Sequence, residues 1–151
     1  MLTPPTGGSG SGPGFASSPR IPQEDLSQDR LLSALKRDEF GRPVLGGIPL
    51  ICRIGKGGMG AVYYGIHPRL RVEVAVKILP FHLLEQDPRL ADRFVTEARL
   101  AASLASDHIV RVLDVDVDQG THYIEMEYVF GESAGAVLRR TGRLNEMQAL
   151  A

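Results

Sequence analysis

Residues 55–62 read G-K-G-G-M-G-A-V, and residues 72–79 read V-E-V-A-V-K-I-L. The first stretch has glycines at the offsets G-x-G-x-x-G, and the second is a β-branched run that carries one lysine, Lys77. With 17 glycines in 151 residues, such a glycine pattern arises by chance in roughly one chain in five. The loop becomes informative because it joins two segments of strand character and the lysine strand comes next.

The residues after Gly60 distinguish this loop from other glycine-rich nucleotide sites. A dinucleotide-binding loop leads from a strand into a helix, whereas residues 61–66 read A-V-Y-Y-G-I and have no helical period. The chain also lacks a G-x-x-x-x-G-K-[S/T] pattern. We therefore expect a hairpin whose loop, free of Cβ atoms, lets backbone N–H groups close over a triphosphate. The alternative is a hairpin that only turns the chain.

The lysine strand is predicted to have one core face and one functional face. Alternation gives a core stripe of β-branched residues, Val72, Val74, Val76 and Ile78. On the opposite face, the small Ala75 leaves room for a flat adenine and Lys77 places an ammonium near phosphate oxygens. The alternative, a lysine that guards an edge strand by pointing to water, fits poorly with its apolar neighbours.

A long helix is predicted over residues 88–105, because Asp87 and Pro88 suit its cap and first turn. Its apolar stripe consists of Leu90, Phe94, Ala98, Ala101 and Leu104. Glu97 falls on this stripe, where a carboxylate needs a cationic partner to offset its desolvation. Lys77 on the neighbouring strand is the natural partner. In the alternative, Glu97 lies at the edge of the stripe and reaches solvent.

The rest of the pattern divides the chain into three parts. Residues 1–21 are rich in Gly, Pro and Ser and are predicted to be a disordered tail. Residues 22–47 are predicted to form a short amphipathic helix and a turn-rich connector. The helix, over residues 22–37, would place four leucines roughly on one side: Leu26, Leu31, Leu32 and Leu35. It would pack on its own domain or on a neighbouring one, or alternatively serve as a regulatory docking helix. The folded domain is predicted to span residues 48–151.

Within that domain the pattern predicts five strands and three helices. The strands are expected at residues 48–54, 61–66, 72–79, 110–116 and 123–129, with a hairpin turn at residues 118–120. Two short helices, at residues 134–140 and 146–151, follow the last strand. Five strands with one long helix between the third and the fourth indicate an α+β fold.

Composition narrows the classes of function. The net charge of -1 gives no basic footprint for nucleic acid. The single cysteine, Cys52, excludes an internal disulfide and is expected to be a small buried hydrophobe. Neither a signal peptide nor a run of eighteen apolar residues occurs. We expect a soluble, cytoplasmic protein. A membrane anchor encoded downstream of these residues stays an open alternative.

Together these motifs resemble the N-terminal lobe of Hanks-type (eukaryotic-like) bacterial serine/threonine protein kinases, over about residues 48–151. Residues 94–98 resemble the family's helix motif, residues 108–112 the entry into its fourth strand, and residues 123–129 its fifth strand and hinge. The resemblance implies a kinase N-lobe with a five-stranded antiparallel sheet and one long αC helix, followed by the hinge and the start of the second lobe.

The resemblance also implies ATP as the ligand, with roles for individual residues. Lys77 would hold the α- and β-phosphates and pair with Glu97, and these two are the implied catalytic residues. Met126 would be the gatekeeper. The implied ATP-binding set is Ile54, Gly55, Lys56, Gly57, Gly58, Met59, Gly60, Ala61, Val62, Ala75, Lys77, Met126, Glu127 and Val129. The backbone of the last two would meet the adenine edge, and Glu132 or Ser133 would contact the ribose.

Residues 1–151 depart from the family in two ways. Ala134-Gly135 replaces a usual leucine and predicts a weakened helix. The motifs H-R-D-x-x-x-x-N, D-F-G and A-P-E do not occur, so the family's catalytic base and Mg²⁺ ligands are missing and no metal site is predicted. We expect this chain to be the ATP-binding part of a kinase that phosphorylates protein hydroxyl groups. By itself, the chain is not expected to catalyse the reaction.

Two alternatives from other classes stay open. A kinase remnant could bind nucleotide or serve as a scaffold without catalysis. Its exposed lobe face would favour self-association or a partner protein. A dinucleotide oxidoreductase would need a helix after Gly60, and the sequence there argues against one.

Overall fold

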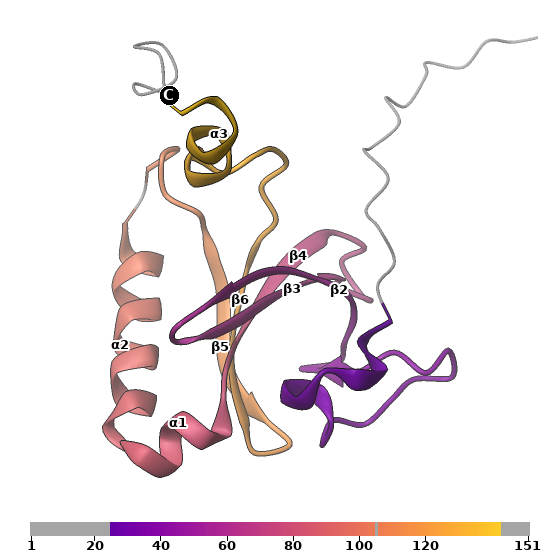
Figure 1. The fold of residues 1–151 in the computed structure, drawn as a ribbon. Helices are drawn as coiled ribbons and strands as arrows, with labels where there is room; N and C mark the ends of the chain where they lie inside the picture. The colour runs from indigo at the N-terminus through magenta and orange to yellow at the C-terminus, as the bar shows by residue number, and fades with distance from the viewer. Residues whose placement is uncertain (1–24, 105, 143–151) are drawn as a thin grey trace, which may run out of the picture.

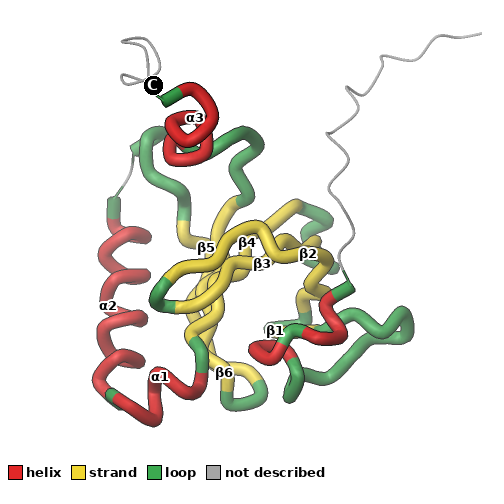
Figure 2. Tube along the Cα trace, viewed as in Figure 1, coloured by secondary structure: helices red, strands yellow, loops and turns green. Residues whose placement is uncertain are grey.

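The computed structural model describes residues 25–104 and 106–142, and within them one antiparallel sheet of six strands forms the centre (Figures 1 and 2). The strands are β1 (Val44–Leu45), β2 (Ile48–Gly57), β3 (Gly60–Ile66), β4 (Glu73–Leu79), β5 (Val112–Asp118) and β6 (Thr121–Glu127). Their order in the sheet is β1-β2-β3-β4-β6-β5. The five predicted strands are present. The prediction of five in total is wrong, because part of the predicted connector pairs with β2 as β1.

The helical elements differ more from the predictions. They are two 3₁₀ turns, η1 (Leu26–Gln28) and η2 (Arg30–Leu32), and three α-helices, α1 (Phe81–Gln86), α2 (Arg89–Ser103) and α3 (Ala134–Thr141). α2 is the predicted long helix, whereas α1 was not predicted. α3 forms despite Gly135, because Ser133 accepts from the Ala136 N–H at 3.2 Å and Gly142 ends the helix at φ 72°. The predicted tail, residues 1–21, and the helix at residues 146–151 lie outside the described residues.

α2 packs on one face of the sheet, toward its β5–β6 end, and residues 25–47, the N-terminal segment, pack on the other face (Figure 1). Against α2, Leu79 and Ile124 pack on Phe94 and Ala98. The opposite cluster joins four leucines of the N-terminal segment to the strands: Leu26, Leu32, Leu35 and Leu45. The predicted core stripe of β4 lies in this cluster at Val74, Val76 and Ile78, but Val72 precedes the strand and is 44% exposed.

The amphipathic helix predicted for residues 22–37 is wrong, because two aspartates divide the segment into separate turns. Asp25 and Asp29 each accept a hydrogen bond from the backbone N–H two residues later, and Asp29 itself is extended. A continuous helix would set Leu26 and Leu32 about 120° apart around its axis, whereas the divided chain buries both on the sheet. Packing on the sheet therefore starts as early as Leu26 and not near Ile48.

Candidate functional site

The glycine-rich stretch forms the tight turn between β2 and β3. Gly57 pairs with Gly60, so the turn consists of two residues. Gly60 has φ 132°, and a Cβ atom there would collide with the carbonyl oxygen of Ile78. In contrast, a Cβ atom at Gly57 or Gly58 would meet nothing within 4 Å. Packing within the chain therefore requires a glycine at position 60, but it does not explain the glycines at positions 57 and 58.

Cross-strand pairing brings the predicted adenine and phosphate residues onto the face that α2 covers. One row across the sheet runs through Gly55, Val62, Lys77 and Ile124. The next row on this face runs through Tyr64, Ala75 and Met126. Residues directly opposite each other in neighbouring strands point to the same side. Four predicted site residues therefore share one surface: Val62, Ala75, Lys77 and Met126.

Lys77 lies on a central strand, between β3 and β6, and is partly buried. Its Nζ atom lies 5.7 Å from the centre of the Phe94 ring on α2, within the range in which a cation is attracted to an aromatic face. The alternative was a lysine on an edge strand that points to water. That alternative does not fit Lys77, which lies on a central strand.

Glu97 does not make the predicted contact. It is exposed, and among residues 25–104 and 106–142 no ion pair joins it to Lys77. α2 packs on the sheet through Phe94 and Ala98, and Glu97 is rotated about 60° from Phe94 around the helix axis. A buried, unpaired carboxylate is unfavourable. Glu97 accordingly lies at the solvent-exposed edge of the apolar stripe of α2, as in the alternative given above.

The end of β6 and the segment that follows it are held by backbone and aromatic contacts. The Glu127 N–H donates to the Arg111 carbonyl at 3.0 Å, and its carboxylate accepts from the Arg111 N–H at 2.8 Å. Tyr64 contacts Tyr128 edge to face, and Tyr128 contacts Phe130 in the same way, each at 4.9 Å between ring centres. This aromatic chain links β3 to the predicted hinge. This aromatic chain was not predicted, because the strand register that brings Tyr64 near residue 128 is not visible in local periodicity.

Other predicted site residues lie at the margin of this surface. Ile54 falls at a register shift of β2 and is 42% exposed, and Met59, in the hairpin turn, is 48% exposed. Val129 is exposed as well. The side chains suggested for the ribose have partners within the chain: Glu132 pairs with Arg140 at 2.8 Å, and Ser133 caps α3.

The opposite face carries a buried carboxylate that the sequence analysis did not identify. Glu125 is 6% exposed and pairs across the strands with Val76 and Asp114. Burial raises the pKa of Glu125; Asp114 adds to the rise, and His67 counteracts it. Alternation along β6 places Glu125 opposite the Met126 face and was a usable signal, but the sequence did not show that the N-terminal segment covers this side.

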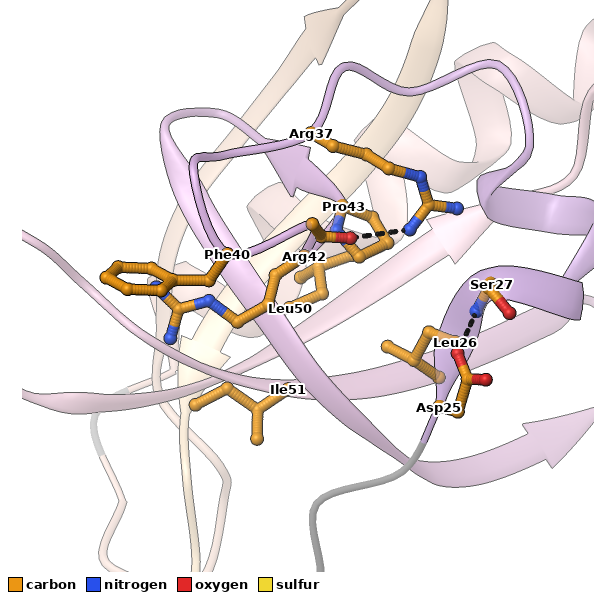
Figure 3. Close-up of a pocket in the computed structure, with 10 residues that line it drawn as sticks. Asp25, Leu26, Ser27, Arg37, Phe40, Arg42, Pro43, Leu50 and Ile51 are labelled. Atoms are coloured by element: carbon orange, nitrogen blue, oxygen red, sulfur yellow. Dashed lines mark hydrogen bonds between the residues drawn. The ribbon is translucent and has the colours of Figure 1, made fainter.

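A separate cavity of about 290 Å³ lies against the N-terminal segment (Figure 3). It is lined by that segment and by Leu50 and Ile51 of β2, and not by the Lys77 face. Phe40 is stacked on the Arg42 guanidinium at 5.0 Å.

Within the described part of the chain, no group of three or more His, Cys, Asp or Glu side chains is arranged to hold a metal ion. The helices of this part are also too short or too polar to cross a membrane.

Comparison with known proteins points to one family. The model of the protein kinase domain matches residues 50–151. The chain is 41% identical over 102 residues to the serine/threonine-protein kinase PknA of Mycobacterium tuberculosis, covering 64% of this chain and 23% of PknA. It is 40% identical over 91 residues to Pkn1 of Myxococcus xanthus, covering 60% of this chain and 13% of Pkn1. The chain thus spans less than a quarter of either relative.

Solved structures agree with the sequence comparison. The crystal structure of the M. tuberculosis PknI kinase domain superposes with a TM-score of 0.55 at 30% identity, covering 65% of this chain and 39% of that one. PpkA-294 in its apo form shares the fold, with a TM-score of 0.58 at 20% identity.

Proposed function

The chain belongs to the protein kinase domain family and is of the Hanks type found in bacterial serine/threonine kinases, and on that premise we propose that residues 48–151 form the ATP-binding part of such a kinase. The observation that carries the proposal is the single surface shared by Val62, Ala75, Lys77 and Met126 beside the glycine hairpin. We also propose a cytoplasmic location, where ATP and a reduced Cys52 are both expected.

The proposed division of labour follows from the chemistry of each group. Gly57 and Gly58 leave open space over the backbone, so triphosphate oxygens can approach the N–H groups closely. Lys77 offers a compact ammonium to the same oxygens. Ala75 has the smallest side chain in its row, so a flat base is proposed to lie over it. Met126, its cross-strand partner, would lie at the edge of that base.

For Glu97 we propose a role that needs a second position of α2. In kinases the pair between the strand lysine and the helix glutamate must be in place for phosphoryl transfer, and helix position controls it. A rotation of α2 by about 60° would turn Glu97 toward the side that Phe94 now occupies. Lys77 would then exchange a cation–π contact for an ion pair.

Transfer of the phosphoryl group is not proposed for residues 1–151 alone. The reaction needs an aspartate beside the attacking hydroxyl and ligands for Mg²⁺. The family motifs that supply them do not occur in this sequence, and the described residues gather no metal-binding group. We therefore assign no reaction step to a metal ion bound by these residues. Phosphorylation of a protein substrate is proposed only for a kinase that also contains the missing motifs.

Equilibrium titration with a fluorescent ATP analogue tests the proposal. We expect Lys77→Met to weaken binding by about tenfold or more, because a charge-assisted contact to phosphate is worth about 1.5–3 kcal/mol. Lys36→Met is the matched control, since Lys36 is exposed on the N-terminal segment, and it should leave affinity unchanged. Equal affinity of both variants would contradict the assignment. Phosphorylation of a protein by residues 1–151 that Lys77→Met abolishes would contradict the proposed lack of turnover.

A second candidate, a scaffold module without catalysis, is favoured by one observation. Around the C-terminal end of α2 and the start of β5, large apolar side chains are exposed: Leu100, Leu104, Ile109, Val110 and Leu113. Such a surface normally meets another protein layer. Concentration-dependent sedimentation of a chain that binds no ATP analogue would favour this candidate, whereas analogue binding that depends on Lys77 would favour the kinase.

A further inference from the structure

We propose that Asp29 is a positioning residue, which holds the stem of the glycine hairpin in the place where it meets nucleotide. The N-terminal segment, residues 25–47, would then be a working part of the nucleotide site. This inference rests on the proposed function, but half of its test is independent of ATP.

The segment is a firm support for such a contact. Its four core leucines, Leu26, Leu32, Leu35 and Leu45, are at most 5% exposed. Its far end is fastened to the turn between β5 and β6. There the Gln119 side chain accepts from the Lys36 N–H at 2.7 Å and donates to the Val44 carbonyl at 2.9 Å. The Asp118 carboxylate accepts from the Gly46 N–H at 2.9 Å.

Asp29 connects this support to both strands of the hairpin. Its side chain is 9% exposed. Oδ1 accepts from the Leu31 N–H at 3.0 Å, which fixes the orientation of the carboxylate. Oδ2 accepts from the Tyr63 hydroxyl at 2.7 Å and from Arg53 Nη1 at 3.3 Å. Arg53 of β2 and Tyr63 of β3 are direct cross-strand partners, so one carboxylate oxygen spans the two strands.

The contact lies beside an irregularity in the pairing of the hairpin strands. The β2–β3 register shifts between Arg53 and Gly55, and such irregularities bend a strand. Beyond this point a cavity of about 480 Å³ lies between the hairpin tip and residues 28–31. The tip therefore does not rest on the segment through close packing. Asp29 holds the stem just before Gly55 and just after Val62.

Hydrogen exchange and nucleotide affinity of the 151-residue chain test the proposal. Asp29→Ala and Asp29→Asn should speed amide exchange in residues 55–61 relative to β4 and β6, and should weaken binding of the ATP analogue by about fivefold or more, the usual lower range for coupled sites. The asparagine keeps an oxygen acceptor for the Leu31 N–H, whereas its NH₂ group cannot accept from Arg53 Nη1 and can only donate to the Tyr63 hydroxyl. Asp29→Asn therefore distinguishes the effect of the bond to the Leu31 N–H from the effect of the bonds to the hairpin.

Asp25 supplies the matched control. It caps the neighbouring turn through an equivalent bond to the Ser27 N–H at 2.9 Å (Figure 3), and within the described part of the chain no hydrogen bond joins it to the hairpin. Asp25→Ala should leave both hairpin exchange and affinity as in the wild type. Tyr63→Phe, which keeps the buried ring and removes the 2.7 Å bond, should reproduce the Asp29 effect, and it is the variant to use if the Asp29 variants do not fold.

The outcomes separate this inference from the proposed function. If exchange speeds up equally in the hairpin, β4 and β6, Asp29 serves only stability and the inference fails. It also fails if the Asp29 and Asp25 variants behave alike, or if faster hairpin exchange leaves affinity unchanged. If the wild-type chain binds no analogue, the proposed function fails and positioning for nucleotide fails with it. In that case, the rate of amide hydrogen exchange in the hairpin tests only whether Asp29 holds the stem.

Discussion

Lys77 and Glu97 show which properties of a single residue can be predicted from sequence. The face on which Lys77 lies follows from strict alternation in a β-branched strand, and cross-strand pairing confirms it. The exposure of Glu97 does not follow from spacing. It depends on how far α2 is turned about its axis, and the packing of Phe94 and Ala98 on the sheet decides that angle.

Glu125 is the residue for which the structure makes a pH-dependent prediction. Burial raises its pKa above the ordinary value of 4.5, so the folded chain holds this proton more tightly than the unfolded chain. The free energy of unfolding should therefore fall as pH rises from the ordinary glutamate pKa through the raised one.

Glu125→Gln should remove this penalty. We expect a gain in stability at pH 7 on the order of 1 kcal/mol, typical of relieving an unfavourable buried polar group. The gain should disappear below the ordinary pKa of a glutamate. Thermal unfolding of both proteins at several pH values checks it. A variant that is less stable than the wild type at neutral pH would show that the charged carboxylate is needed there.

At the scale of elements, periodicity was a good guide to strands and a poor one to the N-terminal segment. The alternating strands and α2 were predicted because their apolar periods match their geometry. In the segment, Leu31, Leu32 and Leu35 imitate a helical stripe, but Asp25 and Asp29 each cap a backbone N–H and start a new turn. The competing side-chain bonds, which are short-range, decide the local structure there.

Two neighbouring leucines test this interpretation of the segment. Leu32 is fully buried on the sheet, whereas Leu31 is only partly buried. Leu32→Ala should therefore lower the free energy of unfolding by about 2–5 kcal/mol, the range for a buried leucine, and Leu31→Ala should have a clearly smaller effect. The predicted amphipathic helix would have made the two losses similar. Denaturant unfolding of the two variants distinguishes the structures.

At the scale of the whole molecule, the sheet has one face for the N-terminal segment and one for α2 and the proposed nucleotide. Its two-sided cover could not be predicted, because contacts such as Lys36 with Gln119 join residues 83 positions apart. The family resemblance gave the placement of the glycine hairpin and the lysine strand. It gave nothing for residues 25–47, which lie before the matched region.

Mapping the ATP analogue onto the backbone amides by NMR tests the central claim most directly. We predict that the largest shifts occur at residues 55–62, near Lys77 and at residues 126–129, and that Lys77→Met reduces them severalfold when the analogue concentration is close to the wild-type Kd. Shifts confined to the cavity beside Phe40 and Arg42 (Figure 3), or no shifts at saturating analogue, would contradict the claim that this sheet face binds ATP.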